Sequence, residues 1–564
     1  MSDLVKSDKV TINVDGQLVE VPKGVNLIEA AACAGKEVPH YCYHPKLSVS
    51  GNCRMCLVEV GAPMRDRETG EPILDTEGNQ KIGWAPKPAI GCAENVREGL
   101  HVRTNSELVQ NCRNGVSEFL LLNHPLDCPI CDQAGECTLQ EYSTQYGRGY
   151  SRSVENKNVK PKRTRLGPRI TLDDERCILC SRCIRFCDEI LEESTLGFVS
   201  RGSYSTLTCY PGKDFDSNYS LNTVDLCPVG ALTSTDFRFK MRVWFLKPVK
   251  SICTESSVGV NTEVWSREGV IYRVTPRRND AVNDDWMSDS GRELYKQVES
   301  DTRLKEFRVD GNKVRFGEAL DRFVELFQAA SGIAYVASGN SSVEEQFLLK
   351  KLSLLKPGSV HFVAHQKQGD GFLISNDRTP NMRGGLLTGL IDRPPEAELS
   401  ALAADIESGQ VKTLVVLGED LSEAGLSGSL LRKVNTLYFG THKNKTSKYS
   451  KVELPTLTVF EKSGTFINQQ FRLQRFHQAV PGPAGLLADV HLLARLLGLL
   501  GGEESMNLPS VDVLWAEMAE AIPAFANISF AGIGDEGIIL DSAPYQSLSF
   551  CEGESLHYKP SASA

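Results

Sequence analysis

The sequence predicts a multidomain chain that is α+β in its N-terminal part and α/β in its C-terminal part. Its 564 residues allow about three or four domains, at roughly 150 residues per domain. Fifteen of its seventeen cysteines lie at or before Cys227. Residues 298–564 instead repeat a strand–turn–helix pattern, as in GIAYVASGNSSVEEQFLLKKL, which is typical of a parallel sheet covered by helices.

Charge and apolar patterning argue against three classes of protein: those that bind nucleic acid, those that span a membrane and those that are secreted. The chain has 62 Lys and Arg against 72 Asp and Glu, a net charge of −10, and no basic patch for nucleic acid. The most apolar segment, His491–Leu500, is too short to span a bilayer and contains Arg495. Met1–Lys9 lacks the apolar stretch of a secretory signal. We therefore expect a cytosolic chain whose ordered cysteines bind metal instead of forming disulfides.

The N-terminal segment is expected to begin as a ubiquitin-like ββα unit, the start of a β-grasp domain. Two alternating strand-like runs, at 9–14 and 17–21, are joined by Asp15-Gly16, a strong hairpin signal. Asn26 can then cap a helix over LIEAAACAG, which Gly35 is suited to end.

A first set of four cysteines follows this unit, spaced C-x10-C-x2-C with a more distant fourth member: Cys42, Cys53, Cys56 and Cys92. Four thiolates suit a [2Fe–2S] cluster, in which each of two irons takes two soft ligands. The spacing is not the plant-type C-x4-C-x2-C, so this interpretation rests partly on the ββα context. A tetrahedral zinc site made from the same four cysteines is the alternative.

A second set combines a histidine with three cysteines inside NHPLDCPICDQAGEC: His124, Cys128, Cys131 and Cys137. All four lie within fourteen residues, and Pro125, Pro129 and Gly135 would help the chain to wrap a [4Fe–4S] cube. A neutral imidazole in place of a thiolate would leave such a cluster with one negative charge fewer. A zinc Cys3His site fits the same residue types. His40 and His44, by contrast, are expected to be ordinary surface or core residues.

The third set lies in CILCSRCIRFC, the C-x2-C-x2-C-x3-C run of bacterial ferredoxins. In that pattern the fourth cysteine, here Cys187, serves another cluster, and a distant Cys-Pro completes the first one. We therefore expect one [4Fe–4S] cluster held by four cysteines: Cys177, Cys180, Cys183 and Cys227. The same spacing counted back from Cys227 reaches only hydroxyl residues, so no second ferredoxin cluster is expected. Cys187 remains the alternative fourth ligand.

These twelve candidate ligands, in this order, closely resemble those of the large iron–sulfur subunit of respiratory complex I, the NADH-quinone oxidoreductase. The resemblance to that family runs across residues 9–240. The same segments are similar to parts of NAD-linked hydrogenases, iron-only hydrogenases and some formate dehydrogenases, so the rest of the chain has to distinguish among these families.

The resemblance implies five domains. They are a [2Fe–2S] ferredoxin-type domain at 8–98, a His(Cys)3 [4Fe–4S] domain at 99–140, a ferredoxin-like [4Fe–4S] domain at 141–245, a molybdopterin-oxidoreductase N-terminal-like segment without its cluster at 246–302, and a degenerate pterin-domain-like α/β scaffold at 303–564.

The C-terminal half is distinguished mainly by ligands that it lacks. Cys253 begins the C-x2-C-x3-C pattern of a further [4Fe–4S] site, but the expected companions are Ser256, Val260 and Ser288, so we expect no cluster there. VELPTLTVFEKSGTFINQQFRLQRF resembles the pterin-binding part of molybdenum oxidoreductases, yet no cysteine lies between Cys253 and Cys551 to bind molybdenum. We expect no molybdopterin, although serine or aspartate can in principle ligate that metal.

The remaining six cysteines are expected to be small buried hydrophobic residues: Cys33, Cys112, Cys187, Cys209, Cys253 and Cys551. The tail from Glu552 onward is expected to be frayed.

The resemblance implies an electron-relay subunit of a proton-translocating NADH:quinone oxidoreductase, a translocase, with no complete active site of its own. It implies an NADH-oxidising flavoprotein subunit and other peripheral-arm subunits as partners. Contact with the cytoplasmic side of the inner (plasma) membrane would be indirect, through the complex.

Two other classes of function remain open. One is an iron–sulfur, diaphorase-type subunit of an NAD-linked formate dehydrogenase or hydrogenase. A hydrogenase would need further cysteines for its catalytic cluster, and only two follow Cys227; a formate dehydrogenase would need molybdenum. The other is a structural subunit whose cysteines bind zinc, which would be colourless.

Overall fold

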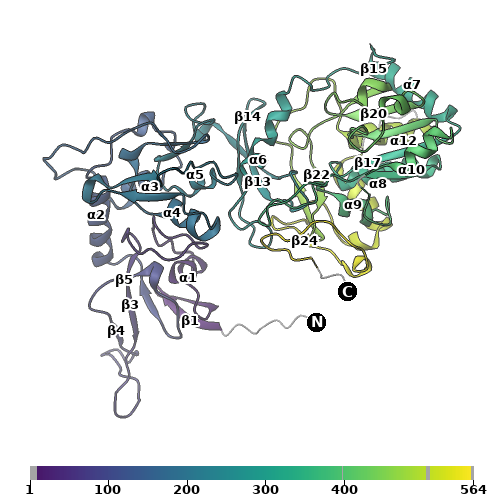
Figure 1. Cartoon of the computed structure of the whole chain (residues 1–564). Coiled ribbons are helices and arrows are strands. Elements are labelled where there is room, and N and C mark those ends of the chain that lie inside the picture. The colour runs from purple at the N-terminus through teal and green to yellow at the C-terminus, as the bar shows by residue number, and fades with distance from the viewer. Residues whose placement is uncertain (1–8, 397, 503–508, 561–564) are drawn as a thin grey trace. The chain divides into compact units, whose positions relative to one another are not determined.

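The computed structural model describes residues 9–396, 398–502 and 509–560, which fall into two units divided between Phe245 and Leu246. Three predictions fall partly outside the described residues. They concern the absence of a secretory signal in Met1–Lys9, the start of the [2Fe–2S] domain at residue 8, and the tail at 561–564. Each unit is described by itself below (Figure 1).

The first unit opens with the predicted ββα unit. β1 (Lys9–Val14) pairs antiparallel with β2 (Gln17–Pro22), and both turn residues have positive φ, +50° at Asp15 and +89° at Gly16. This is the backbone that a two-residue hairpin turn requires. α1 (Leu27–Cys33) begins after Asn26, whose side chain accepts from the Ile28 amide as a cap. These predictions are confirmed.

Four further strands complete this sheet, which has the order β2-β1-β6-β3-β4 with β5 pairing separately with β3. They are β3 (Leu57–Pro63), β4 (Ile82–Trp84), β5 (Ala89–Ile90) and β6 (His101–Arg103). The apolar faces of α1 and the sheet form one core. The segment between β3 and β4 is largely exposed, as expected of a surface loop.

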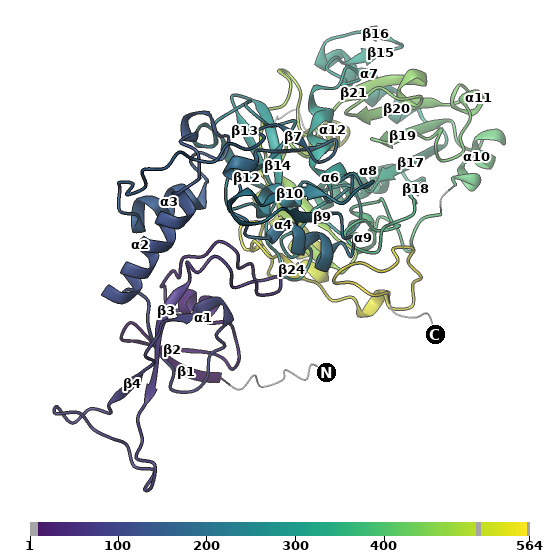
Figure 2. The ribbon, with the colours of Figure 1, turned by 60° about the vertical axis from the view of Figure 1, so that its left-hand side comes forward.

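Two helices follow that lie beside each other: α2 (Glu107–Leu121) and α3 (Thr138–Tyr146) (Figure 2). The rest of the first unit consists of short elements with long connections. They are β7 (Thr164–Arg165), β8 (Ile170–Leu172), α4 (Arg182–Arg185), β9 (Leu196–Val199), β10 (Thr206–Cys209), α5 (Asn222–Leu226) and β11 (Leu232–Ser234). Because these elements are short, loops carry most of the cysteines.

The second unit begins with a three-stranded antiparallel sheet and a short helix. The elements are β12 (Lys247–Ile252), β13 (Asn261–Arg267), β14 (Val270–Pro276) and α6 (Asp289–Glu293).

The predicted parallel sheet is present within a seven-stranded sheet of the order β16-β15-β21-β20-β19-β17-β18 (Figure 2). Its five parallel strands are neighbours and extend to one edge of the sheet. The parallel strands are β17 (Ile333–Ser338), β18 (Ser359–Val363), β19 (Thr413–Leu417), β20 (Asn435–Gly440) and β21 (Ser450–Pro455). The hairpin of β15 (Arg308–Val309) and β16 (Asn312–Lys313) adds an antiparallel edge.

Helices cover both faces of this sheet, as its alternating buried side chains require. Tyr335 and Ala337 belong to the core made with α7 (Phe316–Ala329), α8 (Val343–Leu355), α9 (Met382–Leu387), α12 (Asp489–Leu500) and α13 (Val511–Ala521). Ala334 and Val336 belong to the core made with α10 (Ser400–Glu407) and α11 (Gly428–Leu431). A last sheet contains β22 (Gly464–Ile467), β23 (Arg472–Phe476) and β24 (Ile538–Ile539).

The segment that follows Cys551 is fixed, so the prediction of a frayed tail from Glu552 is wrong for the described residues. Glu552 is only 1% exposed and forms an ion pair with Arg383 on α9. The Asn376 amide and the Ser375 hydroxyl both donate to the Glu552 carbonyl, each at 2.9 Å. A short polar sequence at a chain end carried no signal of these distant partners.

Among the residues described, no helix is both long and apolar enough to cross a membrane. The apolar segment that ends at Leu500 is α12, and its buried face packs in the core of the second unit.

Candidate iron–sulfur sites

Strand pairing brings the first cysteine set together. Cys56 immediately precedes β3, and Cys92 lies in the turn after β5. Because β3 pairs with β5 in the register Leu57 opposite Ile90, the two segments meet, and the Gly91 amide donates to the Cys56 carbonyl at 2.9 Å. A Cβ at Gly91 would lie 2.8 Å from that carbonyl oxygen, so the close approach requires glycine.

The four thiols of this set lie close enough to change one another's pKa values. Interaction with Cys53 and Cys92 lowers the pKa of Cys42, and interaction with Cys92 lowers that of Cys56. The same interactions raise the pKa values of Cys53 and Cys92. A lowered pKa favours the thiolate, which is the form that ligates metal.

The second set lies between α2 and α3. Cys128 begins a short 3-10 turn and is exposed, whereas Cys131 and Cys137 are buried, with Cys137 at the start of α3. Cys131 and Cys137 each interact electrostatically with Cys128, so the three cysteines are neighbours.

His124 presents an unpartnered ring nitrogen. Its Nδ1 is buried and has no hydrogen-bond partner within the described residues. Burial, reinforced by the positive charges of Arg176 and Lys157, lowers the pKa of His124 to about 4. The ring is therefore neutral near pH 7 and can donate a lone pair to a metal.

In the third set Cys180 is buried, and Cys177, Cys183 and Cys227 are half-buried. Burial raises the pKa of Cys180 to about 11 and raises those of Cys177, Cys183 and Cys227 as well. The Leu179 amide donates to the Cys177 sulfur at 3.4 Å, and Leu179 and Ser181 have φ values of +55° and +60°. Residues in this left-handed region turn successive N–H groups inward, an arrangement that suits anions.

Cys227 and Cys187 differ in their surroundings. Cys227 is an electrostatic neighbour of Cys177, Cys180 and Cys183. Cys187 lies buried in the π-helical turn Phe186–Ile190, and its own neighbours are Asp188, Glu193 and Cys209. Cys183 interacts electrostatically with both Cys227 and Cys187, and its interaction with Cys227 is the stronger of the two.

Two arginines that the sequence analysis did not single out join the first and third sets. Arg182 donates to the carbonyl of Tyr43, beside Cys42, and to that of Leu226, beside Cys227. Arg185 donates to the carbonyls of Cys42 at 2.5 Å and Cys180 at 3.3 Å. Both arginines lie inside CILCSRCIRFC, but the spacing of that run contains no information about their partners.

The second and third sets meet at the Cys-Pro segment. The Thr138 amide donates to the Pro228 carbonyl at 3.1 Å. A Cβ at Gly230 would lie only 2.2 Å from the Cys131 sulfur, so this approach again requires glycine. All three candidate sets therefore share one contiguous part of the first unit.

No group of three or more His, Cys, Asp or Glu side chains among the described residues could hold a single metal ion. The fit to iron–sulfur clusters rests instead on donor chemistry: grouped thiols, N–H groups directed at sulfur, and an unpartnered imidazole nitrogen.

The remaining cysteines only partly match the prediction that they are buried. Cys187 and Cys253 are buried, and Cys112 and Cys209 are half-buried. Cys33 and Cys551 are exposed, which corrects the prediction for those two residues. Cys33 is the last residue of α1, and Cys551 lies in a segment without helix or strand. In the second unit, Cys253 has Glu255 as its charged neighbour, and burial raises the pKa of Cys253 to about 12.

Five protein-family models match the chain in order. They are a 2Fe-2S iron-sulfur cluster binding domain (7–107), the NADH-ubiquinone oxidoreductase-G iron-sulfur binding region (113–152), the NADH-quinone oxidoreductase subunit 3 ferredoxin-like domain (167–233), the NADH-ubiquinone oxidoreductase NDSU1/NuoG-like 4Fe-4S domain (246–296) and a molybdopterin oxidoreductase (388–498).

Curated relatives carry the corresponding names. The G subunit of the NADH-quinone oxidoreductase of Rickettsia felis is 39% identical over 363 residues, 63% of this chain and 50% of that protein. Over the matched residues, the chain is similar to the large iron–sulfur subunit of NADH-quinone oxidoreductase. Another relative, the NADH-ubiquinone oxidoreductase 75 kDa subunit of Reclinomonas americana, is 43% identical over 292 residues, 51% of this chain and 38% of that protein.

The chain spans about half the length of the Rickettsia relatives that it matches. The predicted class of fold is confirmed, with 2Fe-2S and 4Fe-4S binding domains followed by a molybdopterin-oxidoreductase-like α/β domain. A solved NAD+-reducing [NiFe]-hydrogenase is 25% identical over 42% of this chain and 91% of its own, with a TM-score of 0.31.

Proposed function

We propose that this chain is the iron–sulfur electron-transfer subunit of a proton-translocating NADH:quinone oxidoreductase, which relays electrons from a flavoprotein subunit toward quinone. The observation that carries this proposal is the grouping of three cysteine-rich sets in one unit, joined by the hydrogen bonds of Arg182 and by the Cys227–Gly230 segment. The names of the relatives point to the same complex.

The proposed cofactors are one [2Fe–2S] cluster and two [4Fe–4S] clusters. The first set would hold the [2Fe–2S] cluster: Cys42, Cys53, Cys56 and Cys92. The second would hold one [4Fe–4S] cluster: His124, Cys128, Cys131 and Cys137. The third would hold the other: Cys177, Cys180, Cys183 and Cys227. When bound, such clusters supply reversible one-electron transfer. Separate domains at 8–98, 99–140 and 141–245 would carry the three clusters.

The surrounding residues would position these clusters and limit the access of water. Cys180 is buried and Cys227 is half-buried, which limits their contact with solvent, and the Leu179 amide directs its N–H group at the Cys177 sulfur. Hydrogen bonds and burial are two of the means by which a protein adjusts cluster potentials, together with nearby charge. The neutral His124 would replace one thiolate charge in its set.

We assign Cys227 as the fourth ligand of the third set because it is an electrostatic neighbour of all three other cysteines, whereas Cys187 neighbours Cys183 but is not among the main electrostatic neighbours of Cys177 or Cys180. Although the segment at 246–296 matches a 4Fe-4S model, Cys253 has hydroxyl or apolar residues at the companion positions, so we propose no cluster there. We also propose that residues 303–564 are a degenerate scaffold without molybdopterin.

The proposed partners are an NADH-oxidising flavoprotein subunit and other peripheral-arm subunits of the complex. The chain would lie on the cytoplasmic side of the inner (plasma) membrane, with membrane contact only through those subunits. No complete active site is proposed on this chain. A diaphorase-type subunit of an NAD-linked formate dehydrogenase or hydrogenase is the other candidate, because related segments occur in those enzymes.

The test is the content of iron, sulfide, zinc and molybdenum per purified chain, together with low-temperature EPR after dithionite reduction. We expect about ten irons, near-zero zinc and molybdenum, and signals from one [2Fe–2S] and two [4Fe–4S] clusters. Stoichiometric molybdenum would support a dehydrogenase instead, stoichiometric zinc would support a structural subunit, and about fourteen irons would mean that the Cys253 segment holds a cluster.

A further inference from the structure

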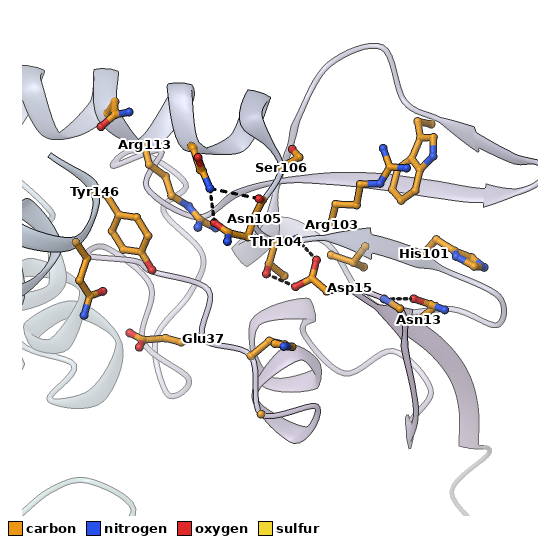
Figure 3. A pocket seen from close by; sticks show the side chains of 18 residues that line it. Asn13, Asp15, Glu37, His101, Arg103, Thr104, Asn105, Ser106, Arg113 and Tyr146 are labelled. Carbon is orange, nitrogen blue, oxygen red and sulfur yellow. Dashed lines mark hydrogen bonds between the residues drawn. The ribbon is translucent and has the colours of Figure 1, made fainter. Parts of the chain in front are cut away.

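A polar cavity lies between the β-grasp sheet and the helices α2 and α3, and no candidate cluster ligand lines it (Figure 3). Its volume is about 1010 Å³. Residues from the hairpin turn, from the loop after α1, from β6 and from both helices line it, including Asp15, Lys36, Arg103, Arg113 and Tyr146. A cavity of this size can accommodate a small organic molecule.

Arg113 is the unusual residue of this cavity. It lies on the buried face of α2 and is only 2% exposed, yet Nε and Nη2 of its guanidinium have no hydrogen-bond partner within the described residues. The central carbon of the guanidinium lies 5.1 Å from the centre of the Tyr146 ring, and Asp15 and Cys56 are electrostatic neighbours that form no hydrogen bond or ion pair with it among the described residues. Burial lowers the pKa of Arg113 from its usual value, but an arginine still remains charged.

A buried charge without a partner is costly, and proteins normally pair it. The hydroxyl of Ser117, one helical turn further along the same face of α2, is also buried and has no partner within the described residues. The buried face of α2 thus presents an unsatisfied cation and an unsatisfied hydroxyl.

The carboxylates nearest to this cation already have other partners. Asp15 accepts from the Thr104 amide at 2.7 Å and from the Thr104 hydroxyl at 2.5 Å. Glu37 accepts from the Tyr142 hydroxyl at 2.5 Å. Figure 3 shows the Arg113 side chain extending from α2 toward Asn105, with Asp15 turned to Thr104.

Other positive groups surround the cavity. Arg103 stacks over the Trp84 ring at 3.8 Å, and Lys36 is exposed at the rim. The N-terminus of α2, a fifteen-residue helix capped by Ser106, also lines the cavity and adds a partial positive charge. Three full positive charges therefore line the cavity, against two carboxylates that are already hydrogen-bonded.

We propose that this cavity binds a small oxyanion, a phosphate or a carboxylate, with Arg113 as its anchor and Lys36 as a second cation. A guanidinium and a helix N-terminus both suit this chemistry. The amide side chains of Gln110, Asn114 and Gln145 line the remaining volume and suit a ligand that carries further hydrogen-bonding groups. The proposal is independent of the proposed electron-transfer function, because none of these residues is a candidate cluster ligand.

The test is isothermal titration calorimetry of the full chain with inorganic phosphate and, separately, with citrate. We expect saturable binding of at least one of them at a single site, and the stronger of the two identifies the oxyanion. Arg113→Gln should weaken that binding at least about tenfold, because it removes the anchoring charge. Lys36→Gln, at an exposed position that carries little risk to folding, should weaken it by about threefold or more.

Arg97→Gln is the matched control, because Arg97 belongs to the same sheet region, is 60% exposed and does not line the cavity. Its binding should equal that of the wild type. Absence of saturable binding of either anion to the wild type would overturn the proposal. So would wild-type affinity in both Arg113→Gln and Lys36→Gln, or equal losses in all three variants, since the latter indicates non-specific attraction.

A thermal measurement separates a binding defect from a folding defect. Anion binding to the folded chain raises its melting temperature by mass action. We expect the stronger anion to raise the melting temperature of the wild type and of Arg97→Gln, but not that of Arg113→Gln. An equal rise in Arg113→Gln would contradict the role of Arg113, whatever the basal stability of that variant.

Discussion

Arg182 donates a hydrogen bond to the Leu226 carbonyl at 3.1 Å, and its other terminal nitrogen donates to the Tyr43 carbonyl. One guanidinium is thus shared between the backbone beside Cys227 and the backbone beside Cys42. Its Nε is buried without a partner among the described residues, and the electrostatic neighbours of Arg182 include Cys180, Cys227 and Cys42. The positive charge of Arg182 therefore lies between two of the proposed clusters.

Arg182→Gln should make both the [2Fe–2S] and the third-set [4Fe–4S] cluster harder to reduce. Loss of a nearby positive charge disfavours the reduced, more negative state, by on the order of 50 mV for each cluster. Redox titration followed by EPR measures both potentials in one sample.

Arg201→Gln is a suitable control, because Arg201 is an exposed arginine of the same unit. Potentials that shift equally in both variants, or a shift in only the cluster held by the second set, would contradict this role of Arg182.

Cys227→Ala and Cys187→Ala should differ in their iron content. If Cys227 completes the third set, its removal should abolish one [4Fe–4S] EPR signal and lower iron from about ten to about six per chain. Cys187→Ala should retain about ten irons, because Cys187 lies among Asp188, Glu193 and Cys209. The reverse outcome would make Cys187 the ligand.

Arg303→Met should strongly destabilise the second unit. Arg303 is buried, donates to Glu461 at 2.6 Å and also donates to the Thr441 carbonyl at 2.7 Å. Its removal leaves a buried carboxylate without its ion pair, at a cost of about 3–5 kcal/mol in the free energy of unfolding. Urea unfolding followed by the fluorescence of the buried Trp286 and Trp515 measures this change.

Lys451→Met provides the contrast, because Lys451 and Asp310 form an exposed pair at 3.1 Å. That variant should lose less than about 1 kcal/mol. Similar losses in the two variants would show that burial does not decide the contribution of these pairs.

Asp377 should make the second unit less stable as the pH rises. Burial, reinforced by the charge of Glu552, raises the pKa of Asp377 from 3.8 to about 6. The folded state therefore holds this proton more tightly than the unfolded state, and the contribution is complete below about pH 4 and is lost as the pH rises through about 6. The loss is about 3 kcal/mol at most.

Asp377→Asn should remove this part of the pH dependence, since an amide oxygen can still accept from the Thr379 amide and does not titrate. Urea titrations between about pH 4 and about pH 7 compare the two proteins. Parallel curves for the wild type and Asp377→Asn would refute the prediction.

Local sequence patterns predicted the elements that depend on neighbouring residues. The Asp15-Gly16 hairpin, the Asn26 cap and the parallel strands that begin at Ile333 and Thr413 all follow from turn chemistry or apolar runs. The antiparallel strand Arg308–Val309 at the edge of the sheet was not predicted, because a strand of two residues has no hydrophobic periodicity.

The candidate ligands were predictable because cysteine spacing is itself a local pattern. Their surroundings were not, since Arg182 and Tyr43 are separated by 139 residues. The burial of the Arg113 guanidinium could not be predicted either, because a single arginine in an amphipathic helix is expected to reach solvent. Glu552 shows the same limit, as its partner lies on α9.

The hydrogen bonds of Arg182 and Arg185 to the loop that contains Cys42 also bear on how the protein can be dissected. The acceptors in this loop are the backbone carbonyls of Cys42, Tyr43 and Ser48. They are present only when the backbone of the β-grasp segment is present. A fragment that starts after the β-grasp segment would remove these three carbonyls and leave Arg182 and Arg185 with only part of their acceptors, among them the carbonyls of Leu226 and Cys180. The cysteine motifs are modular in sequence, but we expect a fragment that contains only one of them to be less stable than the same motif in the full chain.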